Sequence, residues 1–268
     1  FFDYSLDNPQ LDFPLFGTPK ESISDQDYLI GLYASTLIKD GGELQIGIGS
    51  LGDAIVYFLK QRHSNPNLYQ EVLRKFSVLD HFGNLIKKKG DLTPFIEGIY
   101  SATEMLVDGF LHLLDAGILK REVFEDIHLQ RLLNKKLIDH RVTKNTILLL
   151  LENGAIADPM TEQDIVYLKK YGLLKTEAPS KPPFKWEDYL GETLKGGIII
   201  HGGFFLGSSQ FYEKLFNMDI ELKRKINMTS VCRINQLYGH EELDRLQRKD
   251  ARFINTTLMV TLSGAAVS

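Results

Sequence analysis

One acidic residue, Glu104, lies where an apolar segment gives way to an amphipathic pattern. Residues 95–102 predict a strand that ends at Thr103-Glu104, and residues 105–116 predict a helix with Gly117 as its C-cap. Parallel strands gather reactive groups at their carboxyl ends, and a helix N-terminus favours an ionised carboxylate. Such a glutamate could act as a nucleophile. Taken alone, a glutamate that stabilises its own helix is the plainer interpretation.

A glycine-rich turn is the second candidate. Residues 44–48 predict a short apolar strand, Gly47 and Gly49 provide positions without Cβ atoms, and Ser50 with Asp53 resembles a capping box at the start of a helix. Backbone N–H groups and the helix dipole could bind an anion there. Glycines between a strand and a helix serve tight packing as often, and the spacing is neither the dinucleotide fingerprint nor a Walker loop.

Four phrases of the chain resemble, in order, signature sequences of the acetyl-CoA hydrolase and transferase family, a branch of the class I CoA-transferases. They are residues 44–49 with Asp53-Ala54, residues 103–105 with Asp108-Gly109, residues 203–207 running on to Phe211-Tyr212, and residues 254–264. The phrases cover about half of the chain. The resemblance implies an α/β fold and identifies the chain as a fragment from the C-terminal domain of a longer enzyme.

The resemblance also implies the chemistry. Glu104 would attack an acyl-CoA, pass through a mixed anhydride and become a glutamyl-CoA thioester. The substrates would be an acyl-CoA, acetyl-CoA by default, and a small carboxylic acid. No cofactor would be bound permanently, and no metal is expected.

Several further site residues follow from the same resemblance. The pocket for CoA or the acyl group would be lined by backbone donors of five consecutive residues, Gly47, Ile48, Gly49, Ser50 and Leu51. Asn235, at the end of a strand expected over 231–234, would hold Glu104 and the pantetheine arm, although the residues after it depart from the Asp and Pro of the family. Asn255 is the other candidate asparagine, and at a strand start it could equally be a turn residue.

Three other residues could carry chemistry and have plainer interpretations. Glu152 is followed by Asn-Gly, as is the catalytic glutamate of another CoA-transferase branch, but Asn-Gly after an apolar run also predicts a simple turn. His201, beside two glycines at a strand end, is the one histidine worth testing, with a structural role favoured. Cys232 is the only cysteine, lies in an apolar run that predicts core packing, and fits a cytoplasmic protein.

Composition limits the classes of protein to which the chain could belong. With 268 residues, 43% of them hydrophobic, the chain can bury a full core. A net charge of -4 gives no indication of nucleic-acid binding, and the apolar runs are too short to cross a membrane. No signal peptide is visible. The chain begins with Phe1 rather than Met and stops just after a strand-like run, which we interpret as the mark of an excised fragment.

The order of strand and helix patterns predicts an α/β fold, in which a mostly parallel sheet has helices on both faces. We expect an extended lead-in over 1–22, a CoA-transferase-like α/β domain over 23–268 that is incomplete at its C-terminus, and a helical insertion at about 120–195. Further helices are expected over 24–40, 50–63, 64–89 and 208–216, and further strands over 197–201, 228–234 and 258–262.

Three functions remain open at this stage. CoA transfer comes first, and acyl-CoA hydrolysis is the near alternative because water could accept the same intermediate. The third is a non-catalytic CoA-binding or assembly module, whose long insertion docks a partner. A missing N-terminal domain of the same chain is the expected partner, so the fragment should be inactive alone, and homo-oligomerisation stays open.

Overall fold

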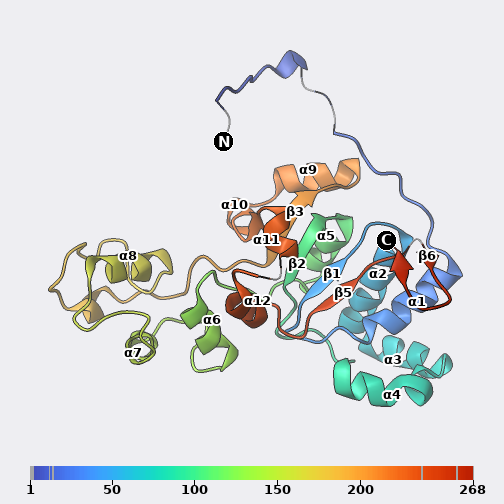
Figure 1. Cartoon of the computed structure of the whole chain (residues 1–268), viewed down its shortest axis with the longest axis horizontal. Helices are drawn as coiled ribbons and strands as arrows, with labels where there is room; N and C mark the ends of the chain where they lie inside the picture. The colour runs from blue at the N-terminus through green and yellow to red at the C-terminus, as the bar shows by residue number, and fades with distance from the viewer. Residues whose placement is uncertain (1–2, 12, 14, 237, 258, 268) are drawn as a thin grey trace.

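The computed structural model describes residues 3–11, 13, 15–236, 238–257 and 259–267, and its architecture is α/β (Figure 1). The helices are α1 (Asp25–Ser35), α2 (Ser50–Ser64), α3 (Pro66–Lys75), α4 (Val78–Lys89), α5 (Asp108–Asp115), α6 (Ile127–Asn134), α7 (Lys144–Glu152), α8 (Glu162–Lys170), α9 (Ser209–Asn217), α10 (Ile220–Lys223), α11 (Val231–Asn235) and α12 (Glu241–Gln247). The strands are β1 (Leu44–Ile46), β2 (Ser101–Leu106), β3 (Ile200–Phe205), β4 (Ile226–Met228), β5 (Arg252–Ile254), β6 (Met259–Val260) and β7 (Ala266–Val267).

Five of these strands run parallel, in the order β5, β1, β2, β3, β4. The ladder of β1 and β5 is joined to the ladder of β2, β3 and β4 by a parallel bridge between Glu43 and Tyr100, where Leu44 N donates to Tyr100 O at 3.0 Å. The mostly parallel sheet predicted from the sequence is therefore confirmed. All five carboxyl ends share one edge, and β6 and β7 form a separate antiparallel pair.

Helices cover both faces of this sheet because its strands alternate their apolar side chains. On one face, α2, α5 and α9 bury Leu59, Phe110 and Phe211 against the strands. On the other face, α11 packs on β2 and β3, and its Ile234 is buried in one cluster with Tyr100, which precedes β2, and Ala102 of β2. The second face is the one that carries Glu104, which follows Tyr100 at even spacing along the chain.

Residues 120–195 form a helical region with a hydrophobic core of its own. Phe124, Leu132, Ile147, Leu168 and Leu194 are buried there, among others. In Figure 1, α7 and α8 lie at the opposite end of the molecule from α1, α3 and α4. The predicted helical character is present, and whether the region is an insertion relative to the CoA-transferase family stays a prediction.

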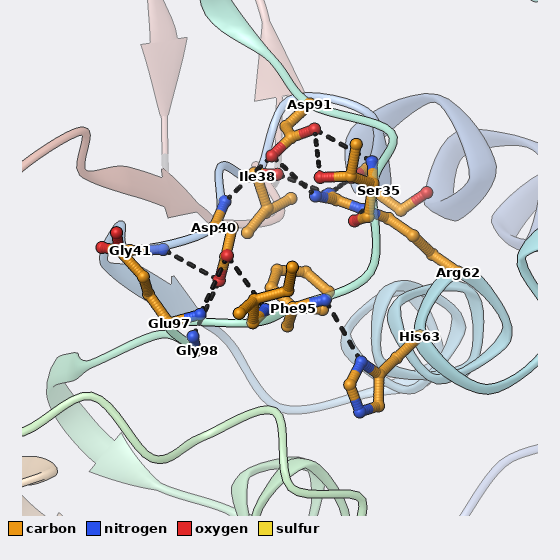
Figure 2. Close-up of polar contacts among 12 residues, drawn as sticks. Ser35, Ile38, Asp40, Gly41, Arg62, His63, Asp91, Phe95, Glu97 and Gly98 are labelled. Carbon is orange, nitrogen blue, oxygen red and sulfur yellow. Dashed lines mark hydrogen bonds and ion pairs between the residues drawn. The ribbon is translucent and has the colours of Figure 1, made fainter.

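The loops that enter β1 and β2 are tied together by Asp40 (Figure 2). Its carboxylate accepts backbone hydrogen bonds from Gly41 (3.1 Å), Ile96 (2.9 Å), Glu97 (2.9 Å) and Gly98 (2.7 Å). Four N–H donors on one carboxylate fix the register at which the two strands start. The opposite, carboxyl edge is thereby aligned as well.

A buried arginine joins the same loops to the helices (Figure 2). Arg62 of α2 is 0% exposed and donates to the carbonyl oxygens of Ile38 (2.5 Å), Ser35 (3.3 Å) and Thr93 (2.7 Å). Its guanidinium also lies 3.4 Å from the carboxylate of Asp91. This arginine therefore holds α1, α2 and the loop before β2 together.

Several predicted boundaries were wrong. The first helix begins as predicted, with Ser24 Oγ accepting from Asp27 N, but ends at Ser35 and not at residue 40. The helix expected over 64–89 is two helices, because Ser77 adopts a left-handed φ of 53° between them. The strand expected over 197–201 begins at Ile200 and runs on to Phe205. The predicted strand 258–262 starts outside the described residues, and β6 covers only Met259–Val260 of it.

The lead-in is extended in its described residues apart from one 3-10 turn, Pro9–Leu11. In Figure 1 its described residues 3–11 lie apart from the sheet, whereas its last residues run back toward α1. Thr18 N donates to Gly207 O at 3.1 Å, which fastens this end to the loop before α9. Within the described parts of the chain, no helix combines the length and the apolar character needed to cross a bilayer.

Candidate functional site

Glu104 lies inside β2 and not at its end. The strand continues through Met105 and Leu106, which lie opposite Phe204 and Phe205 of β3, and the next helix starts only at Asp108. The prediction that the strand ends at Thr103-Glu104 and that a helix follows from Met105 was therefore wrong, and Glu104 is not at the N-terminus of α5. The side chain is half-buried on the face covered by α11.

Asn235 is in hydrogen-bond contact with this glutamate. Its Nδ2 donates to Glu104 Oε2 at 2.9 Å. Asn235 ends α11, a short helix, so the strand predicted over 228–234 was wrong beyond Met228. The helix forms because Ser230 Oγ accepts a hydrogen bond from Cys232 N, an N-cap that outweighs the strand propensity of the apolar residues.

The close approach of α11 to the sheet depends on Gly203. In the β2–β3 register Gly203 lies opposite Glu104, between the pairs Thr103–Gly202 and Met105–Phe204. A Cβ at Gly203 would lie 2.7 Å from Val231 Cγ2 and 2.8 Å from Glu104 O. Only a glycine lets α11 reach this depth, so Gly203 sets the distance between the helix and Glu104.

Arg248 holds the other end of α11. It follows α12 and donates from Nη1 to Ile234 O at 3.0 Å and from Nη2 to Arg233 O at 3.4 Å. Arg233 in turn pairs with Asp244 of α12 at 2.5 Å. These contacts fix the last turn of α11, from which Asn235 projects. Arg248 was not predicted, because a charged residue at the end of a charged helix carries no sequence signal of its hydrogen-bond partners.

The glycine-rich turn has the predicted strand, turn and helix, with a different cap. Gly49 is the N-cap of α2 with φ of 109°, a conformation that suits glycine, and it offers no side-chain cap. The predicted capping box was wrong: Ser50 Oγ donates to Asp27 Oδ2 at 2.8 Å instead of bonding within its own helix. The first N–H groups of α2 therefore lack a side-chain acceptor from the cap.

A pocket of about 260 Å³ opens beside this turn. Its walls come from the glycine turn, the end of β2 and the lead-in, and they include Gly47, Ile48, Gly49, Ser50, Lys20 and Asp108. Four of the five residues predicted to line a CoA or acyl pocket therefore line one pocket, and whether it binds CoA stays a prediction. Leu51 packs against the main hydrophobic core, and Glu104 and Asn235 are not among the lining residues. The resemblance places Glu104 and the glycine turn around the same acyl-CoA, and the expectation that follows, one cleft lined by both, is wrong for this pocket.

The charges around this pocket are of both signs. Lys20 Nζ lies 3.4 Å from Asp108 Oδ1. Burial alone would raise the pKa of Asp108, but hydrogen bonds from Ser208 Oγ (2.6 Å) and Ser208 N (3.1 Å) outweigh it, so the pKa lies below its usual value. Burial raises the pKa of Asp53. Lys20, from the lead-in, is the basic side chain among the lining residues.

Asn255 lies beside the glycine turn and not beside Glu104. It directly follows β5, where Gly47 N donates to Ile254 O at 3.3 Å. A Cβ on Gly47 would lie 3.8 Å from Asn255 Oδ1. Asn255 is exposed at the same carboxyl edge, so the structure brings it together with the predicted pocket residues and leaves the contact with Glu104 to Asn235.

His201 belongs to a buried chain of polar groups. Its Nδ1 lies 2.7 Å from Tyr100 Oη, and its Nε2 lies 3.1 Å from Glu125 Oε1. The hydrogen bond with His201 is the main reason that the pKa of Glu125 falls to about 2. His201 is only 5% exposed, so its contacts account for its burial as a structural residue.

The structure also decides the interpretations of Glu152 and Cys232. Glu152 is the exposed last residue of α7, and Asn153 with Gly154 (φ 69°) forms the turn that ends this helix, as the plainer interpretation predicted. Cys232 is exposed on α11, so its assignment to the core was wrong. Among the described residues, no group of three or more His, Cys, Asp or Glu is placed to hold a metal ion.

Comparison of the sequence with models of protein families gave no match, and comparison with curated proteins gave none either. The site must therefore be interpreted from its geometry and from the four phrases of the sequence.

Proposed function

We propose that this protein transfers CoA between an acyl-CoA and a carboxylic acid, with Glu104 as the nucleophile. The observation that carries the proposal is the 2.9 Å hydrogen bond between Asn235 and Glu104. It orients a half-exposed carboxylate near the carboxyl end of a central parallel strand, where α/β proteins place reactive groups. The resemblance to the acetyl-CoA hydrolase and transferase family supports the same pair.

The proposed reaction needs no co-reactant besides its two substrates. A Glu104 oxygen attacks the acyl carbonyl of the acyl-CoA, and the carbon–sulfur bond breaks. The CoA thiolate is released, and Glu104 then carries the acyl group as a mixed anhydride. The thiolate then attacks the glutamyl carbonyl, and the acyl group departs as a carboxylate. The carboxylate of the acceptor acid attacks the resulting glutamyl-CoA thioester, which releases the CoA thiolate and forms a second mixed anhydride. The thiolate attacks the acceptor's carbonyl in that anhydride, which gives the new acyl-CoA and regenerates Glu104.

Asn235 has two roles in this proposal. Before reaction its N–H orients the carboxylate of Glu104. During each attack on the glutamyl carbonyl, negative charge develops on an oxygen of Glu104, and an N–H donor already at hydrogen-bond distance can stabilise it. The glycine pocket would bind a polar or anionic part of the CoA through the first N–H groups of α2 and through Lys20.

A second function, binding of an acyl-CoA without turnover, is favoured by one observation. Glu104 is not among the residues that line the glycine pocket, and a binding module needs a pocket but no aligned nucleophile. Hydrolysis is the variant of the first proposal in which water is the acceptor. We further propose a cytoplasmic location, which the free thiol of Cys232 favours because reducing compartments keep thiols free.

One experiment separates these functions. The full-length protein, with the N-terminal domain that the resemblance implies, is incubated with acetyl-CoA, with and without propionate. Free CoA and propionyl-CoA are measured by chromatography, alongside calorimetry of acetyl-CoA binding. Transfer predicts propionyl-CoA only with propionate, and its loss in Glu104→Gln but not in the control Glu152→Gln. Equal release of free CoA with and without propionate indicates hydrolysis. Binding that is unchanged in Glu104→Gln, with no turnover, would establish the binding module and refute the transfer proposal.

A further inference from the structure

A larger cavity, of about 540 Å³, lies at the amino-terminal edge of the sheet, away from Glu104. One wall comes from the loops that enter the strands, where Gly41 precedes β1, Glu97 precedes β2 and Lys249 precedes β5. The other wall comes from the helical region, over α6 and the residues up to His140. The cavity therefore lies between the α/β part and the helical region and belongs to neither the glycine pocket nor the Glu104 pair.

Each acidic side chain of this cavity already has a partner. Glu97 Oε1 pairs with Lys136 Nζ at 2.7 Å. Glu122 Oε1 pairs with Lys225 Nζ at 2.5 Å, and Glu122 Oε2 lies 3.6 Å from His140 Nδ1.

The third acid, Asp139, accepts a backbone hydrogen bond from Arg141 N at 2.7 Å. The negative charge of the cavity wall is thus mostly engaged within the protein.

Three basic side chains of the cavity form no ion pair with the described residues. Arg121 donates from Nε to Gly42 O at 3.3 Å and from Nη2 to Gln247 O at 2.6 Å. Lys120 Nζ donates only to a backbone carbonyl, Phe95 O, at 3.3 Å. Lys249 is exposed at the cavity mouth.

Arg121 is preorganised for a ligand. Two backbone carbonyls fix its guanidinium, and the guanidinium carbon lies 5.4 Å from the centre of the Tyr100 ring. Burial lowers its pKa, as expected for a cation whose nearest acceptors are uncharged. A guanidinium held in one orientation recognises the oxygens of a phosphate with little further loss of conformational entropy.

We propose that this cavity is a second ligand site, which binds a small molecule through a phosphate or polyphosphate group. Arg121 provides the fixed fork, and Lys120 and Lys249 provide two flexible cations at the same cavity. The site does not depend on the CoA chemistry proposed for Glu104. A ligand there would contact the α/β part and the helical region together, so its binding would stabilise the folded protein by mass action.

The test uses inorganic pyrophosphate as the probe, titrated into the protein by calorimetry at fixed ionic strength. We expect saturable binding with one site per chain. Lys249→Gln and Lys120→Gln should each weaken it about tenfold or more, because each removes one charge-assisted hydrogen bond. Both lysines are exposed, so the variants should keep the fold, which circular dichroism verifies.

One matched control and one discriminating variant complete the test. Lys75→Gln removes the same charge at an exposed position of α3 and should bind pyrophosphate like the unaltered protein. Lys20→Gln removes it from the glycine pocket and shows whether the probe binds there instead. The proposal is overturned if pyrophosphate shows no saturable binding, if all variants bind equally, or if Lys20→Gln is the variant that loses binding. The last outcome would place the phosphate at the carboxyl edge.

Discussion

Asn235 Nδ2 lies 2.9 Å from Glu104 Oε2, although 131 positions separate the two residues in the sequence. The contact exists because three features act together. Gly203 lets α11 approach the sheet, Ser230 starts that helix, and Arg248 holds its last turn. Each of these features can be removed singly.

Removal of the amide tests its part in catalysis. Asn235→Ala should lower the kcat of CoA transfer about a hundredfold, the usual cost of losing one donor to a developing charge, with little change in stability. Steady-state kinetics and thermal unfolding measure the two effects. The control is Asn65→Ala, since Asn65 is also exposed and donates to a side-chain oxygen, that of Gln61. Equal kcat values in the two variants would contradict the role of Asn235.

Gly203→Ala should push α11 away from β2. The added Cβ would meet Val231 and the backbone of Glu104, so we expect a loss of about 1–3 kcal/mol in the free energy of unfolding. Cys232, the only cysteine and exposed on α11, reports the change through a faster reaction with a thiol reagent.

The matched control for this variant is Gly83→Ala. Gly83 lies in α4, and a Cβ there would meet no atom within 4 Å, so alanine should stabilise the helix slightly and leave the thiol rate unchanged. If both alanine variants behave alike, the position of α11 does not depend on Gly203.

The sequence predicted the elements with strong local signals. The alternation of strands and helices gave the α/β class, and Ser24 and Ser208 marked the starts of α1 and α9 correctly, because a cap is a local interaction. The glycine turn between β1 and α2 was also predicted. These features depend on residues only a few positions apart.

Most of the errors came from long-range contacts. Residues 231–234 favour a strand by propensity, and the helix that they form depends on the burial of Ile234 against Tyr100, which is distant in the sequence, as well as on the local Ser230 cap. Nothing near Glu104 in the sequence shows that β2 continues past it, because that depends on the pairing with β3. For the same reason, no local sequence pattern could predict that the side chain of Glu104 lies outside the glycine pocket.

Stability should depend on pH through Glu43. This residue is 0% exposed, its Oε1 accepts from Ala102 N at 3.2 Å, and its Oε2 has no partner among the described residues. Burial raises its pKa to about 7 from the usual 4.5, against the opposing charges of Arg248 and Arg121. The folded state therefore holds a proton that the unfolded state releases at lower pH.

The pKa of Glu43 is higher in the folded state than in the unfolded state, and this order decides how stability changes with pH. Below pH 4.5 the carboxyl is protonated in both states and its contribution is fully present; the contribution is lost as the pH rises through about 7. The resulting decrease in the free energy of unfolding is about 3 kcal/mol at most. Glu43→Gln should abolish it, so urea unfolding at pH 5 and pH 8 should show a smaller difference in the variant than in the unaltered protein. An identical pH dependence would contradict the assignment.

Arg62→Met should destabilise the protein strongly. Three backbone carbonyls, those of Ser35, Ile38 and Thr93, would lose a donor, and Asp91 would lose its ion pair. We expect a decrease of about 3–5 kcal/mol in the free energy of unfolding. Urea denaturation measures it, and Arg74→Met on exposed α3 is the control, with an expected change near zero. A similar loss in both variants would indicate that the network of Figure 2 carries no particular stability.

The central claim is that Glu104 becomes covalently attached to CoA. Intact-mass spectrometry of the full-length protein, with its expected N-terminal domain, after incubation with acetyl-CoA tests it most directly, and borohydride reduction or peptide mapping locates the modified residue. Transfer through Glu104 predicts an added mass equal to CoA less one water, mapped to Glu104 and absent from Glu104→Gln. An unmodified protein, or an adduct at another residue such as Glu152, would contradict it.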